Sequence, residues 1–269
     1  LPRHQQRWLR KKQAGGLENR APMVKSPLSI EDFPAGFERR LDANLQDCRA
    51  RIAAAAVRSG RAAEDVTLIT VSKYVDSGVM RVLYGLGIRK FGENRPQEAA
   101  RKSRELADLD GVEIHFIGHL QRNKARLTLE HCRSVHSLNS PRLLKELERR
   151  LEDLETGHPD IFVEINISGE ESKMGLPAEE LASLLGDISS SPNVAARLRG
   201  LMTIPPYSSE PDGARACFTQ LRRLRDQHLT SGLLPPGAGL SMGMSSDFEI
   251  AIEEGATVVR VGSAIYSQD

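Results

Sequence analysis

Eight short apolar runs, separated by stretches with helical spacing, constrain the fold of this 269-residue chain more than any other feature. The runs are 66–72, 89–91, 113–118, 134–138, 161–167, 198–202, 239–242 and 257–261. Short β-branched runs that alternate with helices are typical of parallel strands buried on both faces. Eight such units in roughly 200 to 250 residues predict an α/β protein built as a closed (β/α)8 TIM barrel.

An extra helix is expected before the first strand. Phe37, Leu41, Leu45, Cys48 and Ile52 recur on one face and predict a helix over 37–57 that stops at Gly60. The alternative fold is an open doubly wound sheet, which would need a G-x-G-x-x-G after its first strand. Ser72-Lys73-Tyr74 stands there instead, so the barrel is favoured.

The first 25 residues differ from the rest in charge, with seven Lys and Arg against the single acid Glu18. They lack the apolar stretch of a secretory signal. We therefore expect two parts, a disordered basic leader over 1–35 and a barrel domain over 36–269. A functional basic arm is the other interpretation of the leader.

Deleting residues 1–25 should leave the melting temperature and ligand binding nearly unchanged, because this segment lacks the apolar periodicity needed to pack on a barrel. Thermal unfolding and a binding titration of the truncated and full chains would check this. A large drop in either quantity would contradict it.

Composition excludes several classes of function. A net charge of +1 gives no general electrostatic attraction for nucleic acid. No apolar run approaches the ~18 residues that span a bilayer. Cys48, Cys132 and Cys217 are far apart with no C-x-x-C pair, so neither a disulfide framework nor a structural zinc site is expected. These features predict a cytoplasmic protein without a metal; we also expect a monomer.

Lys73 ends the first predicted strand, at the barrel end where TIM-barrel active sites lie. It shares a side of the strand with Ile69 and Val71, which would direct it toward the barrel mouth. A solvated lysine at a strand end is the ordinary interpretation. The functional one is an amine among apolar walls that can form a Schiff base.

The last two strands both end in Gly and Ser, in the segments 240–247 and 259–266. Glycine lets an anion approach the backbone, and hydroxyl groups add donors. The loops after strands seven and eight form the usual phosphate site of TIM barrels, although two ordinary turns would use the same residues. A lysine on strand one and a phosphate cup on strands seven and eight are the two ends of a pyridoxal 5'-phosphate (PLP) site.

Seven ordered motifs between Leu41 and Tyr266 strengthen this interpretation. They are Val71–Lys73, Phe91–Asn94, His115–Lys124, Ile165–Gly175, Arg199–Met202, Ser241–Ser245 and Val259–Gly262. In these the sequence resembles the pyridoxal phosphate homeostasis protein family, whose fold is like the barrel domain of alanine racemase.

The resemblance implies roles for individual residues. Lys73 would hold PLP as a Schiff base, and Arg260 would face the pyridine nitrogen. The phosphate would contact Ser241, Gly262 and Ser263. Three residues would line the ring pocket, namely Asn94, Met202 and Met242.

The sequence departs from the family pattern in three places. Tyr74 stands where many relatives carry Thr, Arg95-Pro96 where Tyr-Val is frequent, and Ser263 where Thr is commoner. Ser263 keeps the hydroxyl, whereas the other two changes alter the outer pocket.

The resemblance further implies a non-catalytic protein that buffers or delivers PLP, with PLP-dependent apo-enzymes as recipients. The chain ends just after the last strand, which leaves no room for the second domain that supplies a catalytic Tyr in alanine racemases. A free-standing amino-acid racemase using Lys73 is the alternative function. An aldolase-like barrel acting on a phosphorylated carbonyl compound is a third.

Other conspicuous residues are interpreted as structural. His115 and His119, four apart in a strand, would be ~13 Å apart and could not share a metal. Tyr207 follows two prolines and is expected at a loop rim. The charged run 145–153 is expected to be the solvated face of a helix.

Overall fold

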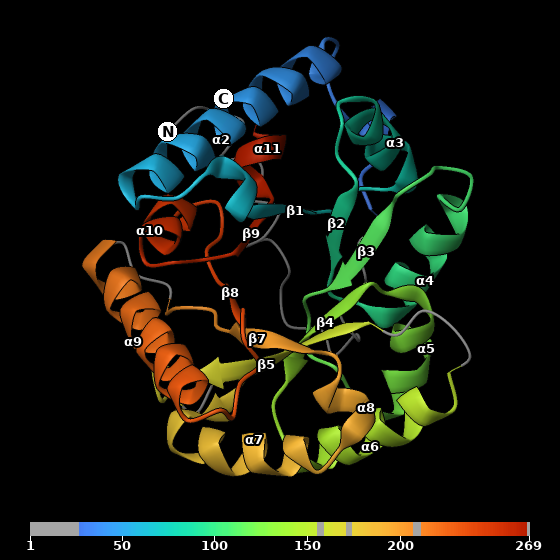
Figure 1. Ribbon diagram of the computed structural model, residues 1–269. Coiled ribbons are helices and arrows are strands. Elements are labelled where there is room, and N and C mark those ends of the chain that lie inside the picture. The colour runs from blue at the N-terminus through green and yellow to red at the C-terminus, as the bar shows by residue number, and fades with distance from the viewer. Residues whose placement is uncertain (1–26, 155–158, 171–173, 207–210, 268–269) are drawn as a thin grey trace, which may run out of the picture.

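The computed structural model describes residues 27–154, 159–170, 174–206 and 211–267. Residues 1–26, most of the predicted leader, and Tyr207 lie outside these ranges. Eight parallel strands form a closed ring, which confirms the predicted barrel (Figure 1). The strands are β1 (Thr67–Val71), β2 (Lys90–Glu93), β3 (Glu113–Phe116), β4 (Ser134–Leu138), β5 (Asp160–Asn166), β7 (Leu198–Met202), β8 (Gly239–Ser241) and β9 (Val258–Val261).

Two strand pairings, β1 with β9 and β4 with β5, complete the ring. β1 lies between β2 and β9, and β4 pairs with β5, so each strand of the ring has two neighbours. The two-residue strand β6 (Leu176–Pro177) pairs only with β5 and lies outside the ring. Each strand lies within its predicted run or extends a residue or two beyond it, since parallel strands covered by helices on one face and by the barrel interior on the other are read in the sequence as short apolar runs.

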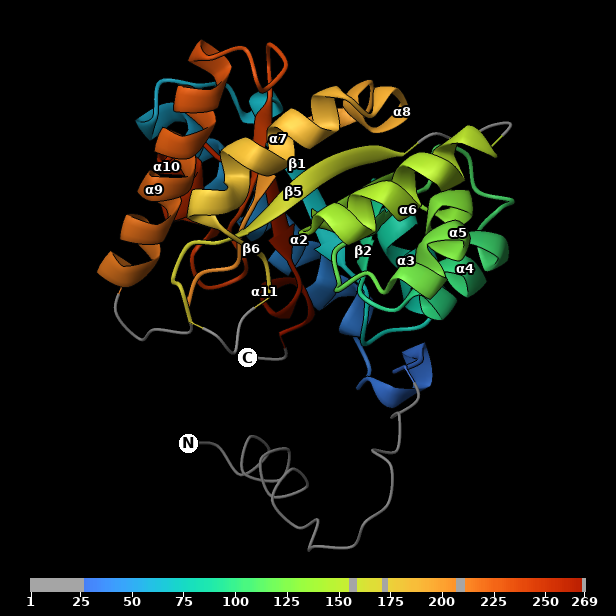
Figure 2. The ribbon, with the colours of Figure 1, turned by 90° about the horizontal axis from the view of Figure 1, so that it is seen from below.

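Helices cover the outside of the ring (Figures 1 and 2). They are α2 (Phe37–Arg58), α3 (Ser77–Gly85), α4 (Pro96–Glu105), α5 (Ala125–His131), α6 (Pro141–Glu152), α7 (Leu181–Ser189), α8 (Pro192–Ala195), α9 (Pro211–Thr230), α10 (Phe248–Glu253) and α11 (Ser263–Tyr266). Short 3-10 turns occupy Ile30–Asp32, Ala63–Asp65, Arg122–Lys124 and Ala178–Glu180.

Local sequence signals set where several helices begin. The Ser140 hydroxyl accepts a hydrogen bond from the Leu143 amide, and Pro141 occupies the first turn of α6. Asp76 caps α3 in the same way through the Val79 amide. The predicted helix over 37–57 is α2; it contacts α10 and α11 and so covers the junction where the chain's last strand meets its first.

The segment just before residue 36 is attached to the barrel. The Leu28 amide donates to the Tyr74 carbonyl at 2.8 Å, and Leu28 pairs with Val75 beyond the end of β1. The Phe33 ring stacks on Phe37 with centroids 3.7 Å apart. Figure 2 shows this segment on the same side of the barrel as α11. Residues 27–35 thus contact the barrel through backbone pairing and ring stacking that composition does not reveal, and the domain boundary at residue 36 stays a prediction.

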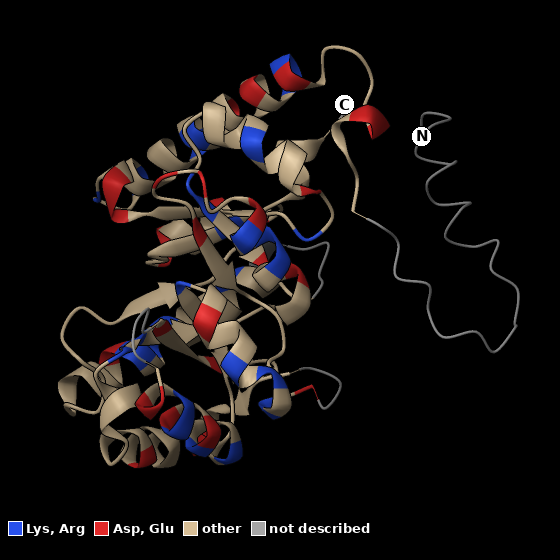
Figure 3. Cartoon of the chain, turned by 90° about the vertical axis from the view of Figure 1, so that its right-hand side faces the viewer, with Lys and Arg blue, Asp and Glu red and all other residues tan. Residues whose placement is uncertain are grey.

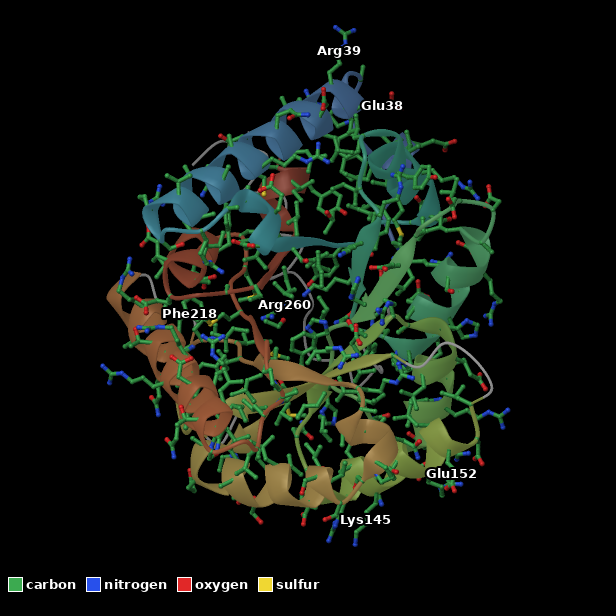
Figure 4. The ribbon with its side chains drawn as sticks, in the orientation of Figure 1. Glu38, Arg39, Lys145, Glu152, Phe218 and Arg260 are labelled. Carbon is green, nitrogen blue, oxygen red and sulfur yellow. The ribbon has the colours of Figure 1, made fainter. Side chains whose placement is uncertain are left out.

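Charged residues lie mainly on the helices, where Figure 3 shows Lys and Arg interspersed with Asp and Glu. On α6, Lys145 and Glu152 are exposed, as predicted for the charged run, while Leu143 and Leu147 are buried (Figure 4). No helix in the described ranges is long and apolar enough to cross a membrane. The interior of the ring, in contrast, contains buried polar and charged side chains.

Candidate cofactor site

The backbone at the carboxyl end of β1 is held by a buried ion pair. Ser72 donates from Oγ to Glu93 Oε1 at 2.6 Å, and Lys102 Nζ donates to the same oxygen at 2.6 Å. Lys102 Nζ also donates to the Ser72 carbonyl at 2.9 Å. Lys102 and Glu93 are 0% and 1% exposed. Ser72 is thereby fixed through both its hydroxyl and its carbonyl, immediately before Lys73.

Lys73 follows this clamp in the turn after β1 and is partly exposed. Its Nζ lies 5.0 Å from the centre of the Tyr74 ring, in a cation–π contact. None of the described residues accepts a hydrogen bond from this amine. The predicted Schiff-base lysine is thus on the carboxyl side of the barrel with its amine uncommitted; its covalent role stays a prediction.

Backbone amides converge on one oxygen at the end of β9. The Gly262 and Ala264 amides both donate to Ser245 Oγ, at 3.1 and 3.2 Å. Ser263, between them, is exposed and begins α11. A side chain at Gly262 would place its Cβ 3.2 Å from Val71 Cβ, so glycine keeps this cradle open toward β1. Two N–H groups aimed at one oxygen are what a phosphate oxygen requires.

The loop after β8 completes the cradle and depends on Gly243. This residue has φ +93°, and a Cβ there would lie 2.6 Å from Ala251 Cβ, so no side chain fits. Its carbonyl accepts the Arg260 amide at 3.0 Å. Asp247 accepts from the Met244 amide at 2.6 Å. These contacts bring Ser245 over the amides of Gly262 and Ala264.

Arg260 lies at the centre of the ring of strands (Figure 4) and is 3% exposed. Its Nη1 donates to Ser241 Oγ at 2.6 Å and its Nη2 to the Thr203 carbonyl at 3.0 Å. Burial lowers the pKa of Arg260 to about 10, and the carboxylates of Glu164 and Asp247 oppose this shift. The guanidinium therefore remains charged at neutral pH.

A buried carboxyl group accompanies this cation. Glu164 on β5 accepts from Asn139 Nδ2 at 3.2 Å. Burial raises the pKa of Glu164 to about 6, while Asn139 and the Arg260 charge act in the opposite direction. Glu164 is consequently ionised for the most part at neutral pH and supplies negative charge near Arg260.

The predicted phosphate residue Ser241 is fully buried, and its hydroxyl contacts Arg260 and His136. Asn94 is exposed at the end of β2, with its backbone against Gly118. Met202 and Met242 are buried; Met242 belongs to the hydrophobic core shared with the helices. The site roles predicted for these residues remain predictions.

Several polar residues of the interior and the site, most of them buried, were not predicted from the sequence, and His115 was interpreted as structural only. The missed residues are Ser134, His136, Glu164, Thr203 and Ser245. The sequence pattern could have revealed Ser134 and His136, because polar residues at alternate positions of an otherwise buried strand lie on one side of that strand. Ser245 lies within one of the seven motifs, but no role was predicted for it.

An open groove of about 380 Å³ lies elsewhere, around the amino ends of β1 and β2. Arg49, Thr67, Gly87 and Lys90 are among its lining residues. It contains none of the predicted site residues. TIM-barrel sites are built at the carboxyl ends of the strands. The candidate site is therefore placed at Lys73 and Arg260 and not in this groove.

Comparisons with known proteins identify the family of the chain. Residues 43–269 match the family model of the alanine racemase N-terminal domain. Proteins named pyridoxal phosphate homeostasis protein from Aquifex aeolicus and Pseudomonas aeruginosa are each 42% identical; the matches cover 81% and 83% of this chain and 93% of each relative. The structure of PipY from Synechococcus elongatus with PLP bound is 33% identical, covers 84% of this chain and all of that one, and has a TM-score of 0.73.

These matches extend over most of both proteins in each pair, and they confirm the resemblance found from the seven motifs. The chain belongs to the pyridoxal phosphate homeostasis protein family, whose barrel is that of the alanine racemase N-terminal domain.

Proposed function

We propose that this protein binds PLP at the carboxyl end of its barrel and buffers or delivers it to PLP-dependent apo-enzymes. One observation carries the proposal: a cradle of two amides converging on one oxygen lies at the end of β9, the strand that bears the buried cation Arg260. β9 pairs directly with β1, which ends at the Lys73 turn. The names of the relatives and the PLP in PipY support it.

The residues of this site suit the three functional parts of PLP. Lys73 would hold its aldehyde carbon through Nζ, and Gly262, Ala264 and Ser263 would hold the phosphate. A phosphate oxygen would then replace Ser245 Oγ as the acceptor for the Gly262 and Ala264 amides. Ser241 is the further phosphate residue that the resemblance implies. Arg260 would face the ring nitrogen, while Asn94, Met202 and Met242 would line the ring.

When bound, PLP supplies a reactive aldehyde and a pyridine ring that withdraws electrons best when its nitrogen is protonated. The Arg260 guanidinium stays charged at neutral pH, and a fixed positive charge beside that nitrogen disfavours its protonation. The site therefore suits retention of the cofactor more than stabilisation of carbanions.

Racemase activity is the alternative, because the barrel is that of the alanine racemase N-terminal domain. Racemisation needs a base on each face of the bound amino acid. Tyr266 has a buried hydroxyl with no described hydrogen-bond partner, but burial raises its pKa, so its phenolate is disfavoured. The buried carboxyl Glu93 raises it further. Tyr266 is thus a poor second base, and delivery is favoured.

Delivery should be measurable as reactivation of a PLP-dependent apo-enzyme by the loaded protein, with slow or undetectable racemisation of L- and D-amino acids. A yellow purified protein would separate both functions from an aldolase-like reaction of a lysine on a carbonyl substrate. The control is the Lys73→Ala protein treated with the same PLP. Racemisation at about 1 per second or faster would overturn the proposal.

A further inference from the structure

A continuous row of buried polar contacts crosses the barrel and ends on Arg260. His115 Nδ1 lies 2.7 Å from Ser134 Oγ, which lies 2.7 Å from His136 Nε2. His136 Nδ1 lies 2.8 Å from Ser241 Oγ, which accepts from Arg260 Nη1 at 2.6 Å. At the far end, His115 Nε2 faces Glu113 Oε2 at 3.4 Å, without the alignment of a hydrogen bond.

This row passes through the interior of the ring. His136 is on β4 and Ser241 on β8, and in the ring these strands are separated by β5 and β7 on one side. Their contact therefore crosses the barrel. The His136 ring also stacks on Phe162 of β5, with centroids 4.5 Å apart, which fixes its plane. The row begins at the amino end of β3 and reaches the carboxyl end of β8.

The charge at each end determines where every proton of the row lies. Contact with His115 lowers the pKa of Glu113, with help from Lys90 and Arg133, so this end is a carboxylate that can only accept. The guanidinium at the other end can only donate. Burial lowers the pKa of His115 and, much further, that of His136, so both rings are neutral and carry one N–H each.

With these ends fixed, one arrangement gives every contact a donor and an acceptor. His115 carries its proton on Nε2, facing Glu113, so its Nδ1 accepts from the Ser134 hydroxyl. Ser134 Oγ must then accept from His136 Nε2–H, and His136 Nδ1 accepts from the Ser241 hydroxyl. Ser241 has no second proton, so only its lone pairs face Arg260.

We propose that His136 and Ser241 are positioning residues that hold the Arg260 guanidinium for the ring of the cofactor through this proton-ordered row. The inference rests on the proposed PLP site. It gives Ser241 a role different from the phosphate contact implied by the family resemblance, because the single hydroxyl proton is already donated to His136 and cannot be donated to a phosphate.

The proton order can be tested without any cofactor. In protein labelled with ¹⁵N-histidine, NMR of the ring nitrogens should show His115 and His136 as neutral Nε2–H tautomers at neutral pH. His119, which is exposed, provides the spectrum of a ring in contact with water for comparison. An Nδ1–H tautomer or a charged ring at either buried position would overturn the proposed order.

The positioning role can be tested by binding of PLP and of pyridoxal, which has the same ring but no phosphate. Ser241→Ala and His136→Leu should weaken binding of both ligands by about tenfold, because the guanidinium loses its fixed orientation in each case. His136→Asn should recover most of this affinity, since its amide oxygen can accept the Ser241 proton. Ser137→Ala is the control. Ser137 follows His136 in the sequence and is as completely buried as Ser241, but its hydroxyl has no described hydrogen-bond partner.

The outcomes separate the two roles of Ser241. Loss of PLP affinity alone in Ser241→Ala, with pyridoxal binding unchanged, would make Ser241 a phosphate ligand and refute the positioning role. Unchanged binding of both ligands in Ser241→Ala would refute it as well. If the wild-type protein bound neither ligand, the proposed PLP function would fail, while the NMR experiment would still decide the proton order.

Discussion

Replacing Lys73 with alanine is expected to abolish the visible absorbance of PLP-loaded protein and its covalent capture by borohydride, while the melting temperature changes little. The amine lies in a turn at the barrel rim, is partly exposed and has no described hydrogen bond. Its removal creates no buried cavity and leaves no buried polar group unpaired. The expected loss is complete because a covalent link to PLP needs this one amine.

Lys145→Ala is the matched control for Lys73→Ala, since Lys145 is an exposed lysine on the outer face of α6 (Figure 4). It should keep both the absorbance and the borohydride capture. Peptide mapping of the reduced wild-type protein should place the label on Lys73. A visible band that persists in Lys73→Ala, or a label on another lysine, would show that the anchor has been assigned wrongly.

Replacing Lys102 with methionine is expected to lower the free energy of unfolding by about 3–5 kcal/mol. Lys102 and Glu93 are completely buried, and their Nζ and Oε1 atoms are 2.6 Å apart. Without the ammonium group, the Glu93 carboxylate stays in the core with only the Ser72 hydroxyl as a described hydrogen-bond donor. Urea denaturation followed by circular dichroism would measure the change.

The double variant Glu93→Gln/Lys102→Met should recover part of this loss, because it removes both charges together. Arg126→Met is the surface control; its ion pair with Glu130 has a similar length, 2.7 Å, but Arg126 is 71% exposed, so the midpoint should barely move. Equal midpoints for Lys102→Met and the wild type would show that the buried pair does not stabilise the fold.

The same clamp links stability to the site. Lys102 and Glu93 hold the hydroxyl and carbonyl of Ser72, and Lys73 is the next residue. A folded Lys102→Met protein should therefore also bind PLP more weakly than the wild type, because the Ser72 carbonyl, just before Lys73, would lose the hydrogen bond from Lys102.

Local patterns in the sequence determined the strands, the N-terminal helix and the carboxyl-end loops. The eight runs became the eight strands of the ring, and the Phe37–Ile52 periodicity became α2, because backbone torsions and burial on one face leave a periodic trace in neighbouring residues. The motifs from 71–73 to 259–262 identified the family for the same reason: each is a short contiguous segment.

Only the tertiary structure decided how the interior is connected. His136 meets Ser241 across 105 positions of sequence, Lys102 reaches back to Ser72, and Leu28 pairs with Val75. No periodicity encodes such partners, since they arise when the ring closes and fixes which strands face one another. The order of protons along the row to Arg260 likewise depends on charges at both ends of the barrel, which only the closed fold brings into one chain of contacts.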